Sequence, residues 1–297
     1  MAIGFAGTAP FAEQVLAGLV DTGHAPLVVL TNPDRPRGRH GMPAPPPIKL
    51  QAVRFGLPVL QPESVSSAEA LADLLAFEPQ VLVVCAYGQI LRQNLLDAVM
   101  TIVVHPSLVP RWRGAAPVER ALMAGETELG VTILKMTAGV DEGPIGAVRR
   151  VSVPADAAAG RAYELLAPLA VDGVLATLAA IADGSVAWRE QIGEPTFAAK
   201  IRPDDRRIDW SRPAKTIVDQ IRALAPHIGA LTELLGRRTS VWRAAVGQGP
   251  LPSSGGGALA LPAGDGWVDV LELQQEGRSR MTAAEFLRGA GRALAGP

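Results

Sequence analysis

The stretch from Met100 to Pro117, M-T-I-V-V-H-P-S-L-V-P-R-W-R-G-A-A-P, decides how the rest of the chain is interpreted. It begins with a short apolar, β-branched run, which predicts a strand from Met100 to Val104. The prolines and the glycine that follow exclude a helix, so His105 lies at the carboxyl end of the strand. Enzymes built on open α/β sheets place their chemistry at such strand ends. His105 is therefore a candidate catalytic residue, although the position also fits a hydrogen-bonded core or surface histidine.

Apolar runs and helical patterns alternate along the N-terminal two-thirds of the chain. Strands are expected at residues 2–6, 26–31, 81–86, 102–104 and 131–136, and helices at residues 11–20, 68–77, 116–124 and 157–182. Such alternation favours a parallel sheet with crossover helices, which is an α/β fold.

The pattern changes in the C-terminal third. A polar segment punctuated by glycine and prolines follows the last helix and suits a linker. Beyond it, one helix at residues 214–224 precedes short β-like pieces separated by Gly, Pro and Ser turns, as in a small barrel or sandwich. We therefore expect a first domain at residues 1–189, a linker at 190–206 and a second domain at 207–297.

Composition limits the protein class. The chain has 297 residues, of which 48% are hydrophobic and 19% charged, a soluble globular profile. No long apolar run lacks a breaker and the first residues do not resemble a signal peptide, so we expect a cytoplasmic protein without membrane segments. The single Cys85 lies in an apolar run, which predicts a buried thiol and no disulfide. No His, Cys or Asp cluster has metal-ligand spacing, so no metal is expected.

Charge is unevenly distributed. Residues from Lys200 onward carry fourteen Lys and Arg against ten Asp and Glu, whereas the preceding residues carry fourteen against nineteen. This asymmetry favours a polyanionic partner for the C-terminal part, with a random scatter of solvated charges as the alternative.

A long loop, Thr31 to Lys49, combines six prolines with cations. Arg35, Arg37, Arg39 and Lys49 on a stiff arm suit contact with a phosphate backbone, because such contact is electrostatic and largely independent of sequence. A solvated insertion is the competing interpretation.

Two further segments lie at expected strand ends. Ala86-Tyr87-Gly88-Gln89-Ile90 offers an aromatic platform beside exposed backbone. Asp141, in G-V-D-E-G-P, would orient His105 and stabilise its protonated form, although an Asp in such a segment is also a common turn former. Gly4 to Thr8 forms a tight turn without the spacing of a nicotinamide-binding loop.

Together these segments resemble the 10-formyltetrahydrofolate-dependent formyltransferases. The motifs are F-A-G-T from Phe5, P-D-R-P-R-G-R from Pro33, A-Y-G-Q-I-L from Ala86, H-P-S-L-V-P-R-W-R-G-A-A-P from His105, G-V-D-E-G from Gly139, T-F-A-A-K-I from Thr196, R-I-D-W from Arg207 and V-W-R-A from Val241. The resemblance implies a Rossmann-like catalytic domain followed by an OB-like barrel that helps to bind the acceptor arm of a tRNA. It also implies transfer of a formyl group from 10-formyltetrahydrofolate to the α-amine of initiator methionyl-tRNA.

The resemblance assigns roles to residues of this chain. His105 and Asp141 fall on the catalytic pair. Folate contacts fall on Ser107, Leu108, Val109 and Pro110, with Ala86, Tyr87, Gly88 and Ile90 beside the pterin. Contacts to tRNA fall on Arg35, Arg37, Arg39 and Lys49, with Arg39 nearest the first base pair. We expect a monomer whose partners are the folate and the initiator tRNA.

One position departs from the family. Where the family has an asparagine that holds the formyl oxygen, two residues before the histidine, this chain has Val103. Loss of one oxyanion donor costs on the order of 10²–10³ in rate. The chain's two asparagines, Asn32 and Asn94, are not expected near this strand end, so the sequence predicts reduced activity.

Two alternatives stay open. The first is a formyltransferase with the same chemistry whose acceptor is an amino sugar nucleotide. The W-R-G-A-A-P motif, the arginine-rich loop and the basic C-terminal part argue against this acceptor. The other is a non-catalytic folate- or tRNA-binding homologue or an inactivated variant, which Val103 favours.

Overall fold

The computed structural model describes residues 1–36, 41–250 and 257–289, and its contacts divide the chain into two compact units. The N-terminal unit comprises Met1–Gly114, Leu129–Val151 and Glu164–Phe197, and the C-terminal unit comprises Ala115–Glu128, Ser152–Tyr163 and Ala198–Pro297.

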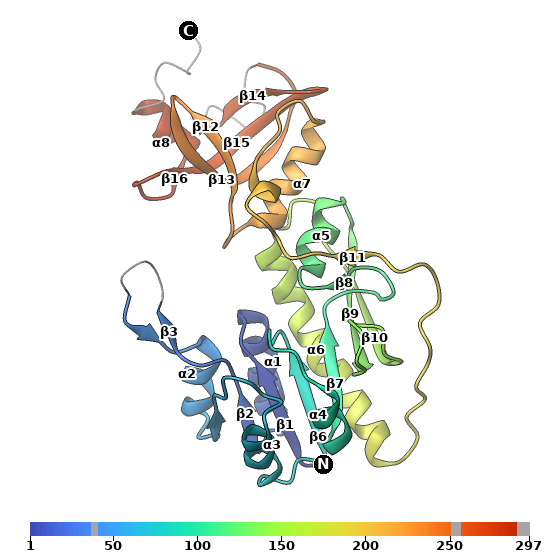
Figure 1. The fold of residues 1–297 in the computed structure, drawn as a ribbon. Coiled ribbons are helices and arrows are strands. Elements are labelled where there is room, and N and C mark those ends of the chain that lie inside the picture. Colours follow the sequence, from blue (N-terminus) through green and yellow to red (C-terminus); the bar gives the residue numbers. More distant parts are fainter. Residues whose placement is uncertain (37–40, 251–256, 290–297) are drawn as a thin grey trace. The chain divides into compact units, whose positions relative to one another are not determined.

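A seven-stranded sheet forms the centre of the N-terminal unit, in the order β10-β9-β7-β6-β1-β2-β5 (Figure 1). Its strands are β1 (Ile3–Gly7), β2 (Val28–Leu30), β5 (Val59–Leu60), β6 (Val81–Cys85), β7 (Met100–His105), β9 (Glu128–Lys135) and β10 (Ile145–Ser152). The strands from β7 to β5 pair in parallel, and β9 pairs antiparallel with β7. The predicted mostly parallel, Rossmann-like α/β fold is confirmed. The buried β1 and β6 read as continuous apolar runs, as strands covered on both faces do.

Helices and a short hairpin complete this unit. They are α1 (Pro10–Asp21), α2 (Pro47–Arg54), α3 (Ala68–Leu75), α4 (Gln93–Ala98), most of α6 (Ala159–Ala182) and the hairpin β3 (Arg35–Pro36) with β4 (Pro43–Ala44). Proline opens α1 and α2, where its missing N–H costs nothing, and the Ser67 hydroxyl accepts from the Ala70 N–H at the start of α3. The long basic loop of the sequence therefore contains a hairpin and the start of α2.

Helix α6 is long and apolar enough to span a membrane by length and composition alone. Core helices of globular proteins meet the same test, and α6 packs inside the fold. Gly18 leaves room for Val171, and Gly173 faces Ile133 of β9. The apolar composition of α6 is explained by this packing.

The C-terminal unit is built on a curved antiparallel sheet in the order β12-β13-β15-β14, with β16 paired to β15 (Figure 1). Its strands are β12 (Ala230–Leu234), β13 (Arg237–Gly247), β14 (Leu259–Ala263), β15 (Gly266–Gln275) and β16 (Met281–Thr282). Its helices are α5 (Pro117–Met123), the 3₁₀ turn Asp204–Arg206, α7 (Ala214–Leu224) and α8 (Ala283–Arg288). One face of α7 buries Ile217 and Ile221 with Val241, Val270 and Phe286. This barrel-like arrangement agrees with the expected OB-like domain.

Helix α5 joins this unit through buried polar contacts with α7. The Arg222 guanidinium donates to Asp219 Oδ1 (2.8 Å), to the Leu122 carbonyl (3.4 Å) and to the Ala157 carbonyl (3.3 Å). Both charged side chains are buried, and such a pair is held in place because separating it would leave an uncompensated charge. The predicted division into residues 1–189, 190–206 and 207–297 stays a prediction.

Candidate active site

His105 ends β7, as the sequence predicts. Its strand pairs with β6 on one side and β9 on the other, where His105 faces Thr132. The side chain is almost fully buried, with 4% of the residue exposed. A buried imidazole needs partners for both ring nitrogens, and the structure supplies them.

The two nitrogens of His105 face different groups. Nε2 lies 2.9 Å from the carbonyl oxygen of Trp112, and Nδ1 lies 3.4 Å from Oδ2 of Asp141. A carbonyl oxygen only accepts, so Nε2 carries a proton. Nδ1 faces the Asp141 carboxyl. Nδ1 is therefore the ring atom able to exchange a proton.

Asp141 is fixed by the backbone around it. Its Oδ2 accepts from the Gly114 N–H at 2.8 Å. Asp141 and Trp112 both adopt left-handed backbone conformations, with φ of 51° and 61°. These are uncommon for residues other than glycine and need supporting contacts. The expected contact between His105 and Asp141 is present in the structure, although their catalytic role remains to be tested.

Val103 lies two residues before His105 on the same strand and so on the same face of it. It pairs across the sheet with Val84 and Leu134, and its partly buried side chain packs against an apolar cluster that includes Tyr87. The position contributes packing and no hydrogen bond from its side chain.

Neither Asn32 nor Asn94 places its side-chain amide beside Val103, where the family has an asparagine. Asn32 follows β2, three strands from β7 in the sheet order, about 14 Å at the usual strand spacing. Its amide donates to the Tyr87 carbonyl (3.2 Å) and accepts from Gln89 (3.0 Å). Asn94 donates to the Ser66 carbonyl at 3.0 Å.

The segment after His105 is held tightly. Ser107 donates from its hydroxyl to the Arg111 carbonyl (2.7 Å), and its own carbonyl accepts from Thr132 Oγ1 (2.7 Å). Gly130 of β9 leaves room for the Leu108 side chain, since a Cβ there would lie 2.3 Å from it. Ser107 and Leu108 are thus engaged within the fold. The folate contacts predicted for Ser107, Leu108, Val109 and Pro110 stay predictions.

The structure corrects the expectation of an aromatic platform at Tyr87. Its ring is buried in the apolar cluster of the sheet, with 3% of the residue exposed, and burial raises the pKa of its hydroxyl. The segment instead presents the backbone of Ala86 and Gly88, both at positive φ, and the side chain of Ile90, 84% exposed. A flat ligand could therefore meet backbone and Ile90 here, and the other folate contacts of this segment stay predictions.

The basic loop is described in part. Lys49 donates to Asp34 Oδ2 at 2.7 Å, and hydrogen bonds from Gln61 and Lys49 lower the pKa of the Asp34 carboxyl. Lys49 is thus already paired. Arg35 is exposed and lies 3.6 Å from Glu63, a weak surface pair. Arg37 and Arg39 lie outside the described residues.

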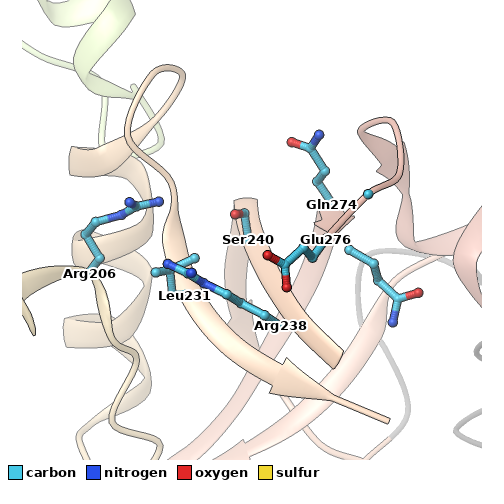
Figure 2. Close-up of a pocket in the computed structure, with 8 residues that line it drawn as sticks. Arg206, Leu231, Arg238, Ser240, Gln274 and Glu276 are labelled. Atoms are coloured by element: carbon cyan, nitrogen blue, oxygen red, sulfur yellow. The ribbon is translucent and has the colours of Figure 1, made fainter. Parts of the chain in front are cut away.

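A pocket of about 250 Å³ lies on the barrel-like sheet of the C-terminal unit (Figure 2). Its lining is Arg206, Leu231, Arg238, Ser240, Gln274, Gln275, Glu276 and Gly277. Arg206 is anchored by donation to the Gly229 and Ile228 carbonyls. Burial and the nearby charge of Arg238 lower the pKa of Arg206. The two guanidinium groups and the Ser240 hydroxyl suit an anion, and the Glu276 carboxylate in the same lining opposes one.

Sequence reasoning missed Gln191 and Thr196. Gln191 donates to the Asp141 carbonyl at 2.8 Å, and Thr196 Oγ1 accepts from the Trp112 N–H at 2.9 Å. They lie in a polar, irregular segment without periodicity. Thr196 opens the T-F-A-A-K-I motif, to which no role was assigned, and Gln191 lies five residues before it, outside any motif. Across the described parts of the chain, no cluster of three or more His, Cys, Asp or Glu residues could hold a metal ion.

Comparison with known proteins shows the family of this chain. A model described as Formyl transferase matches residues 1–178, and one described as Formyl transferase, C-terminal domain, matches residues 200–291. A methionyl-tRNA formyltransferase of Symbiobacterium thermophilum is 39% identical over 299 residues, 97% of this chain and 92% of the relative. The protein of the same name from Thiobacillus denitrificans is 42% identical over 306 residues, 99% of this chain and 97% of the relative.

Solved structures share the fold. HypX from Aquifex aeolicus in complex with tetrahydrofolic acid matches with a TM-score of 0.69 at 19% identity, over 97% of this chain and 48% of that one. This chain thus spans about half the length of HypX. A methionyl-tRNA formyltransferase from Clostridium thermocellum matches with a TM-score of 0.58 at 14% identity, over 82% and 93%. With relatives of high coverage and a family model over more than half of its length, this chain belongs to the formyl transferase family.

Proposed function

We propose that this protein transfers the formyl group of 10-formyltetrahydrofolate to the α-amine of initiator methionyl-tRNA in the cytoplasm, acting as a monomer. The observation that carries the chemistry is the His105–Asp141 pair at the carboxyl end of β7. The acceptor is supported by relatives that carry the name methionyl-tRNA formyltransferase and align with almost the whole chain.

The reaction forms one C–N bond and breaks another. The α-amine attacks the formyl carbon, a tetrahedral oxyanion develops, and the bond from that carbon to the folate nitrogen breaks. The amine loses a proton and the folate nitrogen gains one. His105 suits this exchange, because Trp112 anchors Nε2 and leaves Nδ1 beside Asp141 to take up and return the proton.

Val103 limits the stabilisation of the oxyanion. Its side chain has no hydrogen-bond donor, so the developing charge relies on His105, a backbone N–H or water. We propose that the reaction proceeds, at a rate below that of a site with an amide at this position.

Cations of both units supply contacts to the tRNA backbone in this proposal. Arg35 lies on the N-terminal unit and is followed in the sequence by Arg37 and Arg39, whereas Arg206 and Arg238 line the pocket of the C-terminal unit (Figure 2). The paired Lys49 contributes by holding the base of the loop through Asp34.

The test is formyl transfer from 10-formyltetrahydrofolate to methionyl-tRNA by the wild-type chain and by His105→Ala. We expect turnover by the wild type and a loss of about 10²–10⁴ in kcat for the variant, the usual contribution of an acid–base residue. A wild type that binds methionyl-tRNA without turnover would instead support the non-catalytic homologue that Val103 favours. Transfer to an amino sugar nucleotide in preference to methionyl-tRNA would reassign the acceptor.

A further inference from the structure

The irregular segment that follows α6 runs back toward β8 (Arg113–Gly114), as can be followed in Figure 1. Within it, Gln191 donates from its amide nitrogen to the carbonyls of Asp141 (2.8 Å) and Gly143 (2.9 Å). Its amide oxygen accepts from Nε (3.1 Å) and Nη2 (2.7 Å) of Arg113. An amide has two donor hydrogens and two acceptor lone pairs, and all four are used. Gln191 therefore fixes the loop that carries Asp141.

Thr196, five residues on, holds the other loop of the site. Its hydroxyl accepts from the Trp112 N–H (2.9 Å), and its own N–H donates to the Pro110 carbonyl (3.2 Å). Its carbonyl accepts from the Arg113 N–H at 2.9 Å. The hydroxyl contact fixes Trp112 on the N–H side, and the Arg113 N–H, bonded to the Thr196 carbonyl, belongs to the peptide whose carbonyl faces His105 Nε2.

These contacts converge on one side chain. Trp112 faces Nε2 of His105 and Asp141 faces Nδ1, and both have left-handed backbones. Residues other than glycine keep such conformations only where surrounding contacts over-determine them. Gln191 and Thr196 supply these contacts, one for each ring nitrogen.

We propose that Gln191 and Thr196 are positioning residues that set the orientation and protonation of His105. Both lie between the regions matched by the two family models, in the segment expected to be a linker. The kinetic part of this inference rests on the proposed formyl transfer, whereas its structural part, the placement of Asp141 and Trp112 against the ring, stands without it.

The first test compares Gln191→Leu with Gln220→Leu. Leucine keeps the volume of the side chain and removes its hydrogen bonds. Gln220 is the matched control, because its buried amide also donates to two backbone carbonyls, those of Asp205 and Arg207, both at 2.9 Å. We expect Gln191→Leu to lose about 10- to 100-fold in kcat, the cost of a small misplacement, with KM for the folate within about threefold. Gln220→Leu should keep kcat within about twofold. Equal kcat losses in the two variants would overturn the proposal.

The second test uses Thr196, whose main-chain bonds survive substitution. Thr196→Val removes only the acceptor for Trp112, and Thr196→Ser restores it. We expect a fivefold to tenfold loss of kcat for valine, on the order of one lost hydrogen bond, and near wild-type kcat for serine. Equal kcat in the two variants would contradict the role of the hydroxyl. Because this pair perturbs the fold little, it decides the question even if Gln191→Leu does not fold.

The third test needs no turnover. The chain has four histidines, so the ¹⁵N signals of the His105 ring can be assigned by comparison with His105→Ala. We expect Gln191→Leu to shift these signals toward those of Asp141→Ala, and Gln220→Leu to leave them in place. An unshifted ring in Gln191→Leu would refute the proposal. A wild type without formyl transfer but with the expected shifts would refute only the proposed function.

Discussion

At the scale of single residues, the site is a histidine whose two nitrogens are each assigned a partner. The sequence predicted His105 and Asp141 because strand ends and motif order pointed to them. It did not predict Gln191, whose partners lie between 48 and 78 residues away and share no pattern with it. The prediction of an aromatic platform at Tyr87 was wrong, because the sequence motif does not determine whether the ring of Tyr87 points into the core.

Val103→Asn tests the departure from the family pattern. An amide on the face of β7 that carries His105 can donate to the oxyanion, so we expect kcat/KM for methionyl-tRNA to rise at least about tenfold. The midpoint of thermal unfolding should fall, because the amide enters a partly buried, apolar position. Val103→Ala is the control for lost bulk and should show no gain in kcat/KM. An asparagine variant no faster than wild type would mean that another group already stabilises the oxyanion.

Glu119→Gln tests a partly buried carboxyl on α5. Burial raises the pKa of Glu119, and the Tyr163 hydroxyl lies 3.2 Å from both of its oxygens. A raised pKa means that the folded state binds the proton more tightly than the unfolded state. The free energy of unfolding is then largest below the unfolded pKa and falls as pH rises through the folded pKa.

Glutamine keeps an acceptor for Tyr163 and removes this pH-dependent penalty. We expect the variant to match the wild type in thermal midpoint near pH 4 and to exceed it by about 2 °C at pH 8. The exposed Glu194→Gln serves as control and should show no such growing difference. A constant difference between variant and wild type across this range would contradict the burial argument.

At the scale of elements, the bounds of helices with strong apolar periodicity were predicted most accurately from the sequence. The helix predicted at residues 214–224 is α7, and that predicted at 157–182 is α6 with two residues fewer. It missed β10 and β12, which stand at the edges of their sheets. An edge strand buries less of its surface, so exposed and charged residues interrupt its alternation, as in I-G-A-V-R-R-V-S of β10.

The pocket on the barrel-like sheet gives a prediction at this scale. Arg238→Ala should weaken methionyl-tRNA binding and reduce the slope of log K against log salt by about one, as expected for the loss of one phosphate contact. Arg243→Ala is the matched control, because Arg243 lies on the same strand and pairs with Glu272 at 3.4 Å. The binding constant for methionyl-tRNA and its salt slope are measured for both variants by binding titrations at several salt concentrations. Identical slopes in the two variants would exclude the pocket from tRNA contact.

At the scale of the whole molecule, successive segments of the chain belong in turn to the N-terminal and the C-terminal unit. Composition and pattern change suggested two consecutive domains, which the family models at 1–178 and 200–291 resemble in outline. The sequence could not reveal that residues 115–128 and 152–163 belong with the C-terminal unit. That grouping depends on tertiary contacts such as Arg222 with the Leu122 carbonyl, and on the Arg120–Asp205 ion pair at 2.6 Å.

A fragment of residues 1–199 tests this interleaving. It contains α5 but lacks α7, so the buried face of α5 loses its partner. We expect the fragment to bind a dye for exposed apolar surface and to unfold at a lower temperature than the full chain, with lower cooperativity. A fragment as stable as the full chain, without dye binding, would show that the two segments fold independently.

The order of synthesis separates helix α5 in time from its packing partner α7. Residues of α5 leave the ribosome long before those of α7, and at roughly 5–20 residues per second this leaves its apolar face unpaired for several seconds. The nascent chain can complete β1 to β7 during this interval, but not the surroundings of α5. A cell that makes this protein therefore has a period in each round of synthesis when a chaperone can bind that helix, and the period ends only when α7 emerges.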